Sequence, residues 1–212
     1  MDPAPPSPRR LPGQGVLVVF EGIDGAGKST QVRRLVDGLR AGGWDVVMDR
    51  EPTDGPHGRR LRESAVTGRL SAAEELELFM ADRRQHVAEV IQPALDSGRV
   101  VVLDRYYHSN AAYQGSRGLD WREIVRRNEA FAPRPDLVLW IDVDPAVSGA
   151  RIRARGDVAN QFERIDQLQR CREIFAGLGD ERIQRIDGAQ AESEVEGDVR
   201  EAVQALLSTR SR

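Results

Sequence analysis

Residues 22 to 29 combine glycines, one lysine and one hydroxyl in the spacing of a phosphate-binding loop. They read Gly22-Ile23-Asp24-Gly25-Ala26-Gly27-Lys28-Ser29 and match G-x-x-x-x-G-K-[ST]. In such a loop, backbone N–H groups surround phosphate oxygens, the lysine reaches the β- and γ-phosphates, and the hydroxyl binds Mg²⁺. Lys28 is the only lysine among 31 basic residues, so the chain uses lysine where this loop requires a compact, flexible charge. We therefore expect the segment up to Thr30 to hold phosphates, with Ser29 as a metal ligand.

A carboxylate and a guanidinium, Asp104 and Arg105, follow the apolar run at 100–103. In open parallel sheets, ligands bind beyond the carboxyl ends of the strands. Both side chains would then lie beside the phosphate loop if this strand neighbours the first one. Asp104 could hold Mg²⁺-bound water and Arg105 could bind a second phosphate. The alternative is an ion pair between the two that caps the strand.

Aromatic and amide side chains gather directly after this strand. All three tyrosines of the chain fall between residues 106 and 113. Aromatic faces stack on bases and amides hydrogen-bond to base edges, so the segment suits a nucleoside. The residues that we expect to contribute are Ser109, Asn110, Tyr113 and Gln114.

Two further sets of residues could face the same ligand. Phe79 and Arg83 stand four apart in a helical pattern and project from one face, so they could sandwich a base and bond its carbonyl edge. From spacing alone, a core phenylalanine and a solvated arginine is the better interpretation. Arg50 precedes Glu51-Pro52, whose bond could be cis in a tight turn. It could reach a phosphate from the opposite wall of the cleft or simply be exposed.

Arginines are frequent between residues 151 and 172. The segment 156–160 predicts a flexible lid, over about 151–163, that would bring an arginine onto the transferring phosphate. An arginine in that role can raise the rate of phosphoryl transfer by several powers of ten. A solvated helix face is an equally good interpretation. The candidates are Arg151, Arg153 and Arg155.

The elements that must position these residues follow from the hydrophobic pattern. Five short apolar runs, at 16–20, 45–48, 100–103, 137–143 and 182–186, alternate with helical patterns, which is the α/β signature. Helices are expected around 58–67, 71–97 (kinked near Pro93), 120–132, after Asp144, and along the tail. We predict one three-layer α/β/α domain over 15–212, after a disordered, proline-rich lead-in at 1–14.

Composition excludes several classes of protein. The net charge of −3 and the pI of about 5.7 argue against a general nucleic-acid binder. No apolar run approaches the ~20 residues of a membrane span, and the start has no signal-peptide apolar region. The single Cys171 cannot form an internal disulfide, which fits a reducing cytosol. We expect a cytoplasmic protein that binds neither nucleic acid nor membrane.

Taken together, these residues resemble the thymidylate kinase family, from Val16 to about Leu178. The segments that carry the resemblance are Phe20 to Gln31, Arg50-Glu51-Pro52, Leu78-Phe79 with Arg83, Asp104-Arg105-Tyr106, Ser109 to Gly115, and Pro135-Asp136-Leu137. The resemblance implies a homodimer with a five-stranded parallel sheet and Mg²⁺-dependent transfer of the ATP γ-phosphoryl group to dTMP.

The resemblance also implies roles for single residues. Phe79 would stack on thymine, Arg83 would bond its carbonyl edge, and Arg105 would bind the dTMP phosphate. Asn110 and Tyr113 would contact the nucleotide, and Asp24 would lie beside the acceptor sugar and phosphate. Gly25 stands where some relatives have a phosphate-loop arginine, so this chain is similar to the members whose catalytic arginine is in the lid.

Two other kinds of function stay open at this point. A sister deoxynucleotide or deoxynucleoside kinase is possible, because the loop after Pro52 and the lid depart from the family pattern. A catalytically silent nucleotide-binding module would have no use for the lid arginines. A GTPase is excluded, since a chain with a single lysine at position 28 cannot carry a second one in an Asn-Lys-x-Asp motif.

Overall fold

A twisted, five-stranded parallel sheet forms the centre of the computed structural model, which describes residues 7–68, 70–154 and 161–211. The strands are β1 (Val16–Glu21), β2 (Val46–Arg50), β3 (Val100–Asp104), β4 (Leu137–Asp142) and β5 (Ile183–Asp187). Their order is β2-β3-β1-β4-β5, with every pair parallel. The predicted strands and the α/β/α class are confirmed, and β1 and β3 are neighbours, as the site requires.

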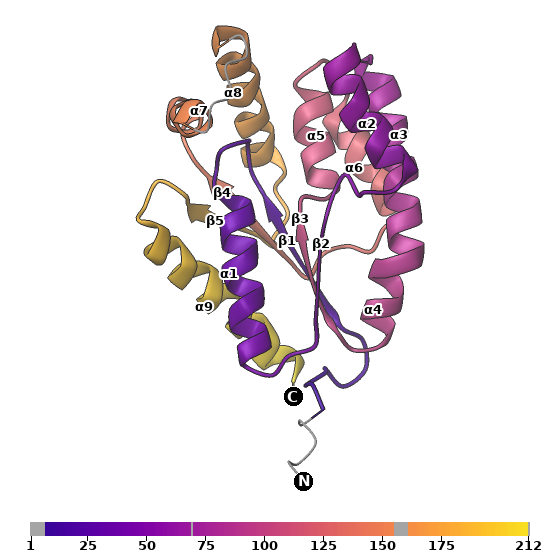
Figure 1. Ribbon diagram of the computed structural model, residues 1–212, viewed down its shortest axis with the longest axis vertical. Coiled ribbons are helices and arrows are strands. Elements are labelled where there is room, and N and C mark those ends of the chain that lie inside the picture. Colours follow the sequence, from indigo (N-terminus) through magenta and orange to yellow (C-terminus); the bar gives the residue numbers. More distant parts are fainter. Residues whose placement is uncertain (1–6, 69, 155–160, 212) are drawn as a thin grey trace.

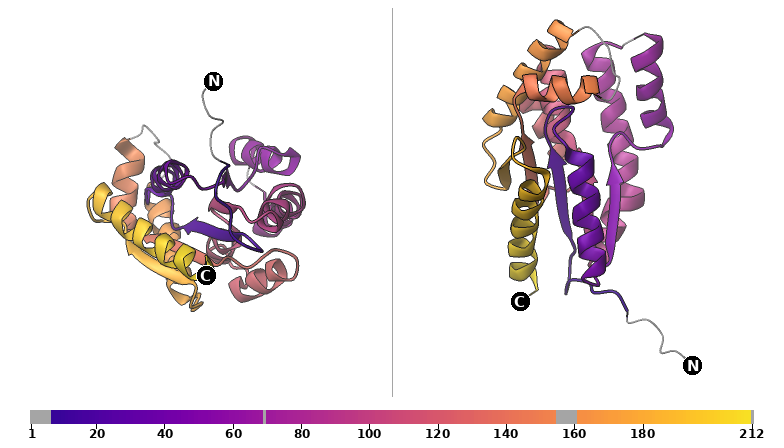
Figure 2. Two further views of the ribbon diagram at one scale, coloured as in Figure 1. Left: turned by 90° about the horizontal axis from the view of Figure 1, so that it is seen from below. Right: turned by 60° about the vertical axis from the view of Figure 1, so that its left-hand side comes forward.

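The sheet is buried on both faces because the residues of β1 alternate between two cores. Val18 and Phe20 pack with α1 (Lys28–Ala41), α8 (Gln161–Gly177) and α9 (Glu192–Arg210). Leu17 and Val19 pack against the opposite layer. Burial of apolar side chains on both faces is what the uninterrupted apolar runs predicted. Figure 2 shows the helices on the two sides of the sheet.

The opposite layer is built by α2 (Pro56–Thr67), α3 (Ala72–His86), η1 (Val87–Ile91), α4 (Gln92–Asp96), α5 (Tyr107–Gly115) and α6 (Trp121–Glu129). The expected helix over 71–97 begins at Ser71, whose hydroxyl and Glu74 form a capping box. After α3 the helix continues through a π-helical turn, η1, which ends just before Pro93 in α4. A wider turn there fits a residue that lacks an N–H and clashes with the carbonyl four residues earlier. α5 was not predicted as a helix.

The remaining described helix, α7 (Pro145–Ala154), follows β4 and lies beside α8 above the sheet (Figure 1). Asp144 accepts a hydrogen bond from Ala146 N at 2.8 Å, which confirms the expected cap before Pro145. Of the predicted lid, residues 155–160 lie outside the described residues. Among the helices that are described, none is both long and apolar enough to cross a bilayer.

The prediction of a disordered lead-in up to residue 14 is wrong for residues 9 to 11, while residues 1–6 lie outside the description. Arg9 pairs with Trp44 in a β-bridge, and its guanidinium lies over the indole ring, 4.4 Å from the centroid. Leu11 is buried and its N–H donates to Gly98 O at 2.8 Å. Sequence composition missed these contacts because a single leucine among prolines carries no periodic signal.

Candidate functional site

The phosphate loop joins β1 to α1, as the sequence predicted. The backbone at Gly22 has φ 139°, and a Cβ there would lie 2.4 Å from Ile141 O, so only glycine fits against β4. Lys28 is the first residue of α1, and its Nζ donates to Ile23 O at 2.9 Å. Burial and the nearby Arg105 lower the pKa of Lys28 to about 8. The loop thus presents helix N–H groups and an ammonium at one place, which is an anion site.

A hydroxyl and a carboxylate meet beside this loop. Ser29 Oγ donates to Asp104 Oδ2 at 2.5 Å. The contact exists because β1 and β3 are paired in register, with Phe20 opposite Asp104, so that the ends of both strands lie at the same edge. Both groups are hard oxygen donors of the kind that Mg²⁺ prefers.

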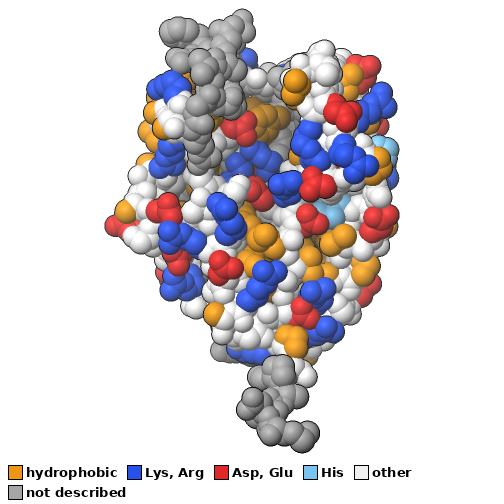
Figure 3. All heavy atoms as spheres, in the orientation of Figure 1, with side chains coloured by type: hydrophobic (Ala, Val, Ile, Leu, Met, Phe, Trp, Pro, Cys, Tyr) orange, Lys and Arg blue, Asp and Glu red, His pale blue; other side chains and the backbone are white. Residues whose placement is uncertain are grey.

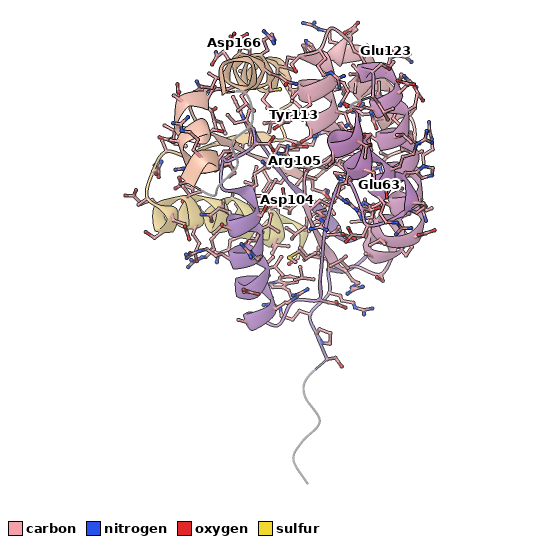
Figure 4. The ribbon with its side chains drawn as sticks, turned by 45° about the horizontal axis from the view of Figure 1, so that its top comes forward. Glu63, Asp104, Arg105, Tyr113, Glu123 and Asp166 are labelled. Atoms are coloured by element: carbon pink, nitrogen blue, oxygen red, sulfur yellow. The ribbon has the colours of Figure 1, made fainter. Side chains whose placement is uncertain are left out.

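Arg105 directly follows the end of β3 and lies beside the phosphate loop. Of the described residues other than glycine, it is the one with a positive φ, 74°. Its guanidinium donates to Asp24 Oδ1 at 2.6 Å, Ser109 Oγ at 2.9 Å and Gly22 O at 3.2 Å. Unfavourable backbone angles persist where the surroundings hold them, often at functional sites. Figure 4 shows Tyr113, Arg105 and Asp104 close together at the centre, whereas Glu63, Glu123 and Asp166 lie at the periphery.

A buried carboxylate that we did not single out from sequence supports Arg105. Glu21 ends β1 and accepts from the N–H groups of Tyr106 at 2.8 Å and Ser109 at 3.1 Å. Complete burial raises the pKa of Glu21 to about 7. Glu21 therefore fixes the first turn of α5 against the phosphate loop. Its sequence signal is weak, since a lone acid after an apolar run usually marks only a strand end.

A cavity of about 360 Å³, here called the acceptor cavity, opens beside Arg105. Among its lining residues are the predicted substrate residues Phe79, Arg83, Arg105, Ser109, Asn110, Tyr113 and Gln114. The structure thus brings together side chains from α3 and α5 that the sequence separates by some thirty positions. The interpretation of Arg83 as a solvated residue is wrong, because its side chain is 1% exposed.

Hydrogen bonds fix Arg83 within the acceptor cavity. Its Nε donates to Glu51 Oε2 at 2.8 Å, and its Nη1 donates to Asn128 Oδ1. The guanidinium also lies over the ring of Tyr106, 5.1 Å from the centroid. Within the described part of the chain, Asn110 Oδ1 and the Tyr106 hydroxyl are buried without a hydrogen-bond partner. Since buried polar atoms are normally paired, these two are open to a ligand.

Glu51 is shared with a buried histidine. His86 Nδ1 lies 3.1 Å from Glu51 Oε1, and His86 Nε2 lies 3.2 Å from Asp49 Oδ2. Burial opposes protonation, but the two carboxylates outweigh it and raise the pKa of His86 to about 9. The imidazolium and Arg83 together neutralise the two acids. The sequence offered no sign of this pairing, because His86 has no motif around it.

A second cavity, of about 500 Å³, contains the phosphate loop and is here called the donor cavity. Asp24, Glu51 and Arg105 line both cavities. Arg50 lines the donor cavity rather than the acceptor cavity, and its guanidinium donates to Asp54 at 2.9 Å. Figure 3 shows charged side chains of both signs gathered in the hollow between the two upper parts of the molecule.

The three candidate lid arginines have different positions. Arg151 donates to Gly188 O at 3.0 Å and to Ala26 O at 3.4 Å, so it reaches the phosphate loop. Arg153 is exposed, and Arg155 lies outside the described residues. Arg151 is thus the described member of this set that contacts the nucleotide-binding elements.

A parallel sheet of this order, with a phosphate loop after its central strand and a second cavity beside the loop, defines a P-loop nucleotide kinase. The family model "Thymidylate kinase" matches residues 20–199. The chain belongs to the thymidylate kinase family.

Individual relatives agree with the family match. A thymidylate kinase of Xanthomonas oryzae pv. oryzae is 57% identical over 164 residues, which are 77% of this chain and 72% of that protein. One of Xanthomonas campestris pv. campestris is 49% identical over 198 residues, 93% of this chain and 87% of that protein. One of Xylella fastidiosa is 51% identical over 164 residues, covering 77% and 75% respectively.

Proposed function

We propose that this protein is a thymidylate kinase, which transfers the γ-phosphoryl group of ATP to dTMP and yields dTDP and ADP. The observation that carries the proposal is the pair of adjoining cavities, which share Asp24, Glu51 and Arg105. One cavity has the groups that bind a polyphosphate and the other has the groups that bind a base. Their shared wall is where two phosphates would meet in line, and positioning of that kind supplies much of the catalysis in phosphoryl transfer.

The donor cavity suits ATP with Mg²⁺. The loop N–H groups and the Lys28 ammonium would bind the β- and γ-phosphates. Ser29 and Asp104 offer a hydroxyl and a carboxylate side by side, and this donor set fits Mg²⁺. The metal would neutralise charge on the phosphates. Arg151, which already contacts Ala26 O and Gly188 O, would border the adenosine end of ATP.

The acceptor cavity suits a thymine base. Phe79 offers an aromatic face, and Arg83 is held rigidly enough by Glu51 and Asn128 to donate to a base carbonyl. The unpartnered Asn110 Oδ1 matches the N3–H of thymine, because an acceptor requires a donor. Asp24 and Tyr113 would border the sugar, since both lie between the base-binding residues and the phosphate loop.

The reaction needs little covalent help from the protein. An oxygen of the dTMP phosphate attacks the γ-phosphorus, the bond from that phosphorus to the β,γ-bridging oxygen breaks, and ADP leaves with that electron pair. The attacking phosphate is already anionic near neutral pH, so no strong general base is required. Lys28 and Arg105 would stabilise the charge that spreads over the moving phosphoryl group.

A coupled assay of ADP release tests the proposal. The purified protein is supplied with Mg·ATP and, separately, dTMP, dUMP, dCMP, dGMP or thymidine, and dTMP is expected to give the highest kcat/KM. Turnover confined to another acceptor would identify a sister kinase. Absence of turnover with every acceptor, together with retained ATP binding, would identify a silent nucleotide-binding module.

Two finer expectations accompany this function. The homodimer and the cytoplasmic location implied by the resemblance stay predictions, which sedimentation equilibrium and cell fractionation test directly. The assignment of the catalytic arginine to the lid also stays a prediction. It is supported by Gly25, which stands where some relatives have a phosphate-loop arginine. A Cβ at this position would lie 2.8 Å from Ser148 O, so the loop has no room for an arginine here.

A further inference from the structure

The acceptor cavity contains a chain of three side chains that begins at a carboxylate. Gln114 Nε2 donates to Glu75 Oε2 at 3.2 Å, and Asn110 Nδ2 donates to Gln114 Oε1 at 3.2 Å. All three residues line the cavity and all three are buried. Glu75 belongs to α3, four residues before Phe79, whereas Asn110 and Gln114 are one turn apart on α5.

The carboxylate dictates how both amides are turned. An ionised carboxylate only accepts hydrogen bonds, so Gln114 must present its nitrogen to Glu75. The oxygen of the Gln114 amide therefore faces Asn110. Because that oxygen accepts, Asn110 must donate to it from Nδ2. This leaves Asn110 Oδ1 buried and without a hydrogen-bond partner among the described residues. The orientation of Asn110, ordinarily ambiguous for an amide, follows here from the chemistry of Glu75.

We propose that Glu75 is a positioning residue that selects the base: through Gln114 it leaves an acceptor on Asn110, which takes a pyrimidine with an N3–H donor and rejects one with an N3 acceptor. The inference rests on the proposed function and deepens it. Thymine and uracil carry a hydrogen on N3, whereas the N3 of cytosine is an acceptor. Two acceptors facing each other in a buried site leave both unpaired, which discriminates strongly.

The role of Glu75 can be tested because Arg117 shares this carboxylate with Gln114. Arg117 Nη1 donates to the same Glu75 Oε2 that accepts from Gln114. In a Glu75→Met variant, Arg117 Nη1 and Gln114 Nε2 both lose the oxygen that they share, while Arg117 Nη2 keeps its bond to Leu70 O. We expect Arg117 Nη1 then to draw the Gln114 amide oxygen toward itself. The Gln114 amide then turns, Asn110 turns in response, and Asn110 presents its nitrogen to the base. The variant is thus expected to reverse the donor and acceptor at this position.

The measurement is the ratio of kcat/KM for dTMP to that for dCMP. We expect Glu75→Met to lower this ratio by about tenfold or more, as the loss of one buried hydrogen-bond match requires. The ratio of dTMP to dUMP should not change, because both bases carry the N3–H. Both ratios compare substrates on one enzyme preparation, so a partly unfolded sample does not move them.

Conservative and matched variants separate positioning from a structural role. Glu75→Gln should keep the wild-type ratio, because its amide oxygen can take the place of Oε2 and accept from both Arg117 and Gln114. Glu77→Met changes an acid on the same helix that is exposed and paired with Arg127, and it should leave the ratio unchanged. If Glu75→Met does not fold, Glu75→Met/Arg117→Met removes both charges together and should still lower the ratio.

The outcomes are distinct. A wild-type dTMP to dCMP ratio in a folded Glu75→Met or double variant would overturn the role of Glu75, even if dTMP kinase activity is intact. A ratio lowered equally by Glu75→Gln would also overturn it. If the wild-type protein does not phosphorylate dTMP at all, the proposed function itself fails, and this is visible before any variant is made.

Discussion

Ser29 Oγ lies 2.5 Å from Asp104 Oδ2, so a hydroxyl in the first turn of α1 and the carboxylate that ends β3 form one polar pair. The two residues are far apart in sequence and are joined by the parallel pairing of β1 with β3. The pair stands at the mouth of the phosphate loop, where a nucleotide-bound cation would need oxygen ligands.

Removal of the Asp104 carboxylate should weaken the response to Mg²⁺. We expect Asp104→Asn to raise the half-saturating Mg²⁺ concentration by about 10- to 100-fold, as loss of a group that orients a metal's ligands commonly does. Initial rates measured across a Mg²⁺ titration at saturating ATP and dTMP check this. Asp37→Asn changes an exposed acid of α1 that is not among the residues lining either cavity, and it serves as the control. An unchanged titration curve for Asp104→Asn would contradict the assignment.

Lys28 should be both essential for turnover and chemically distinctive. Lys28→Met is expected to lower kcat by about 10²- to 10³-fold, the usual cost of losing a preorganised electrostatic group, while the circular dichroism spectrum is retained. Near-normal turnover in this variant would refute the role. Arg40→Met, in the last turn of α1 and not among the residues that line the donor cavity, is the matched control.

The lowered pKa gives Lys28 a second signature. An amine-directed reagent attacks the neutral amine, so labelling of Lys28 should rise as the pH increases through about 8, rather than through the ordinary 10.5. Peptide mapping separates this label from the one on the α-amine. Saturating Mg·ATP should suppress labelling, because phosphate contacts cover the amine and favour its charged form. Labelling that ignores Mg·ATP would contradict phosphate binding at Lys28.

Arg105 should bind the acceptor phosphate through its planar guanidinium, which offers several N–H donors in a geometry that lysine lacks. Its guanidinium contacts Asp24, Ser109 and Gly22 O at once. We expect Arg105→Lys to lower kcat/KM for dTMP by about a hundredfold, because a point charge cannot keep these contacts. The affinity for ATP, measured by calorimetry without dTMP, should change far less. An equal loss for both nucleotides would indicate a collapsed phosphate loop instead.

His86 should make stability depend on pH. The folded-state pKa of His86, about 9, exceeds its ordinary value of 6.5, so protonated His86 stabilises the native state. This contribution is fully present below pH 6.5 and is lost as the pH rises through 9. A shift of this size corresponds to roughly 3 kcal/mol.

The measurement compares wild type with His86→Gln by urea unfolding at pH 6, 7.5 and 9.5. The stability advantage of the wild type should shrink as the pH rises. Lys28, whose pKa is lowered, acts in the opposite direction above pH 8, but it is present in both proteins and cancels in the difference. A difference in free energy of unfolding that is constant across this range would show that no imidazolium is held between Asp49 and Glu51.

The sequence predicted those parts of the site whose residues are adjacent or periodic. The phosphate loop and the strand ending in Asp104 are local sequence patterns, and uninterrupted apolar runs predict the buried strands. The helix α5 was missed because Tyr107, His108 and Asn110 give no amphipathic period. The roles of Glu21, Glu51 and Glu75 in the site were not predicted, for another reason. Each of these acids bonds to a residue on a different element. A single acid in the sequence does not indicate which distant residue it will bond to.

The position of β1 in the sheet has a consequence for how the chain acquires its structure. The central strand β1 is synthesised well before its two neighbours, β3 and β4: Val16 pairs with Val100, and Val18 pairs with Leu137. Contacts between such distant residues slow folding, since a long loop must close before they form. A nascent chain that ends before β4 leaves one edge of β1 bare, with its apolar side chains open to aggregation or to a chaperone.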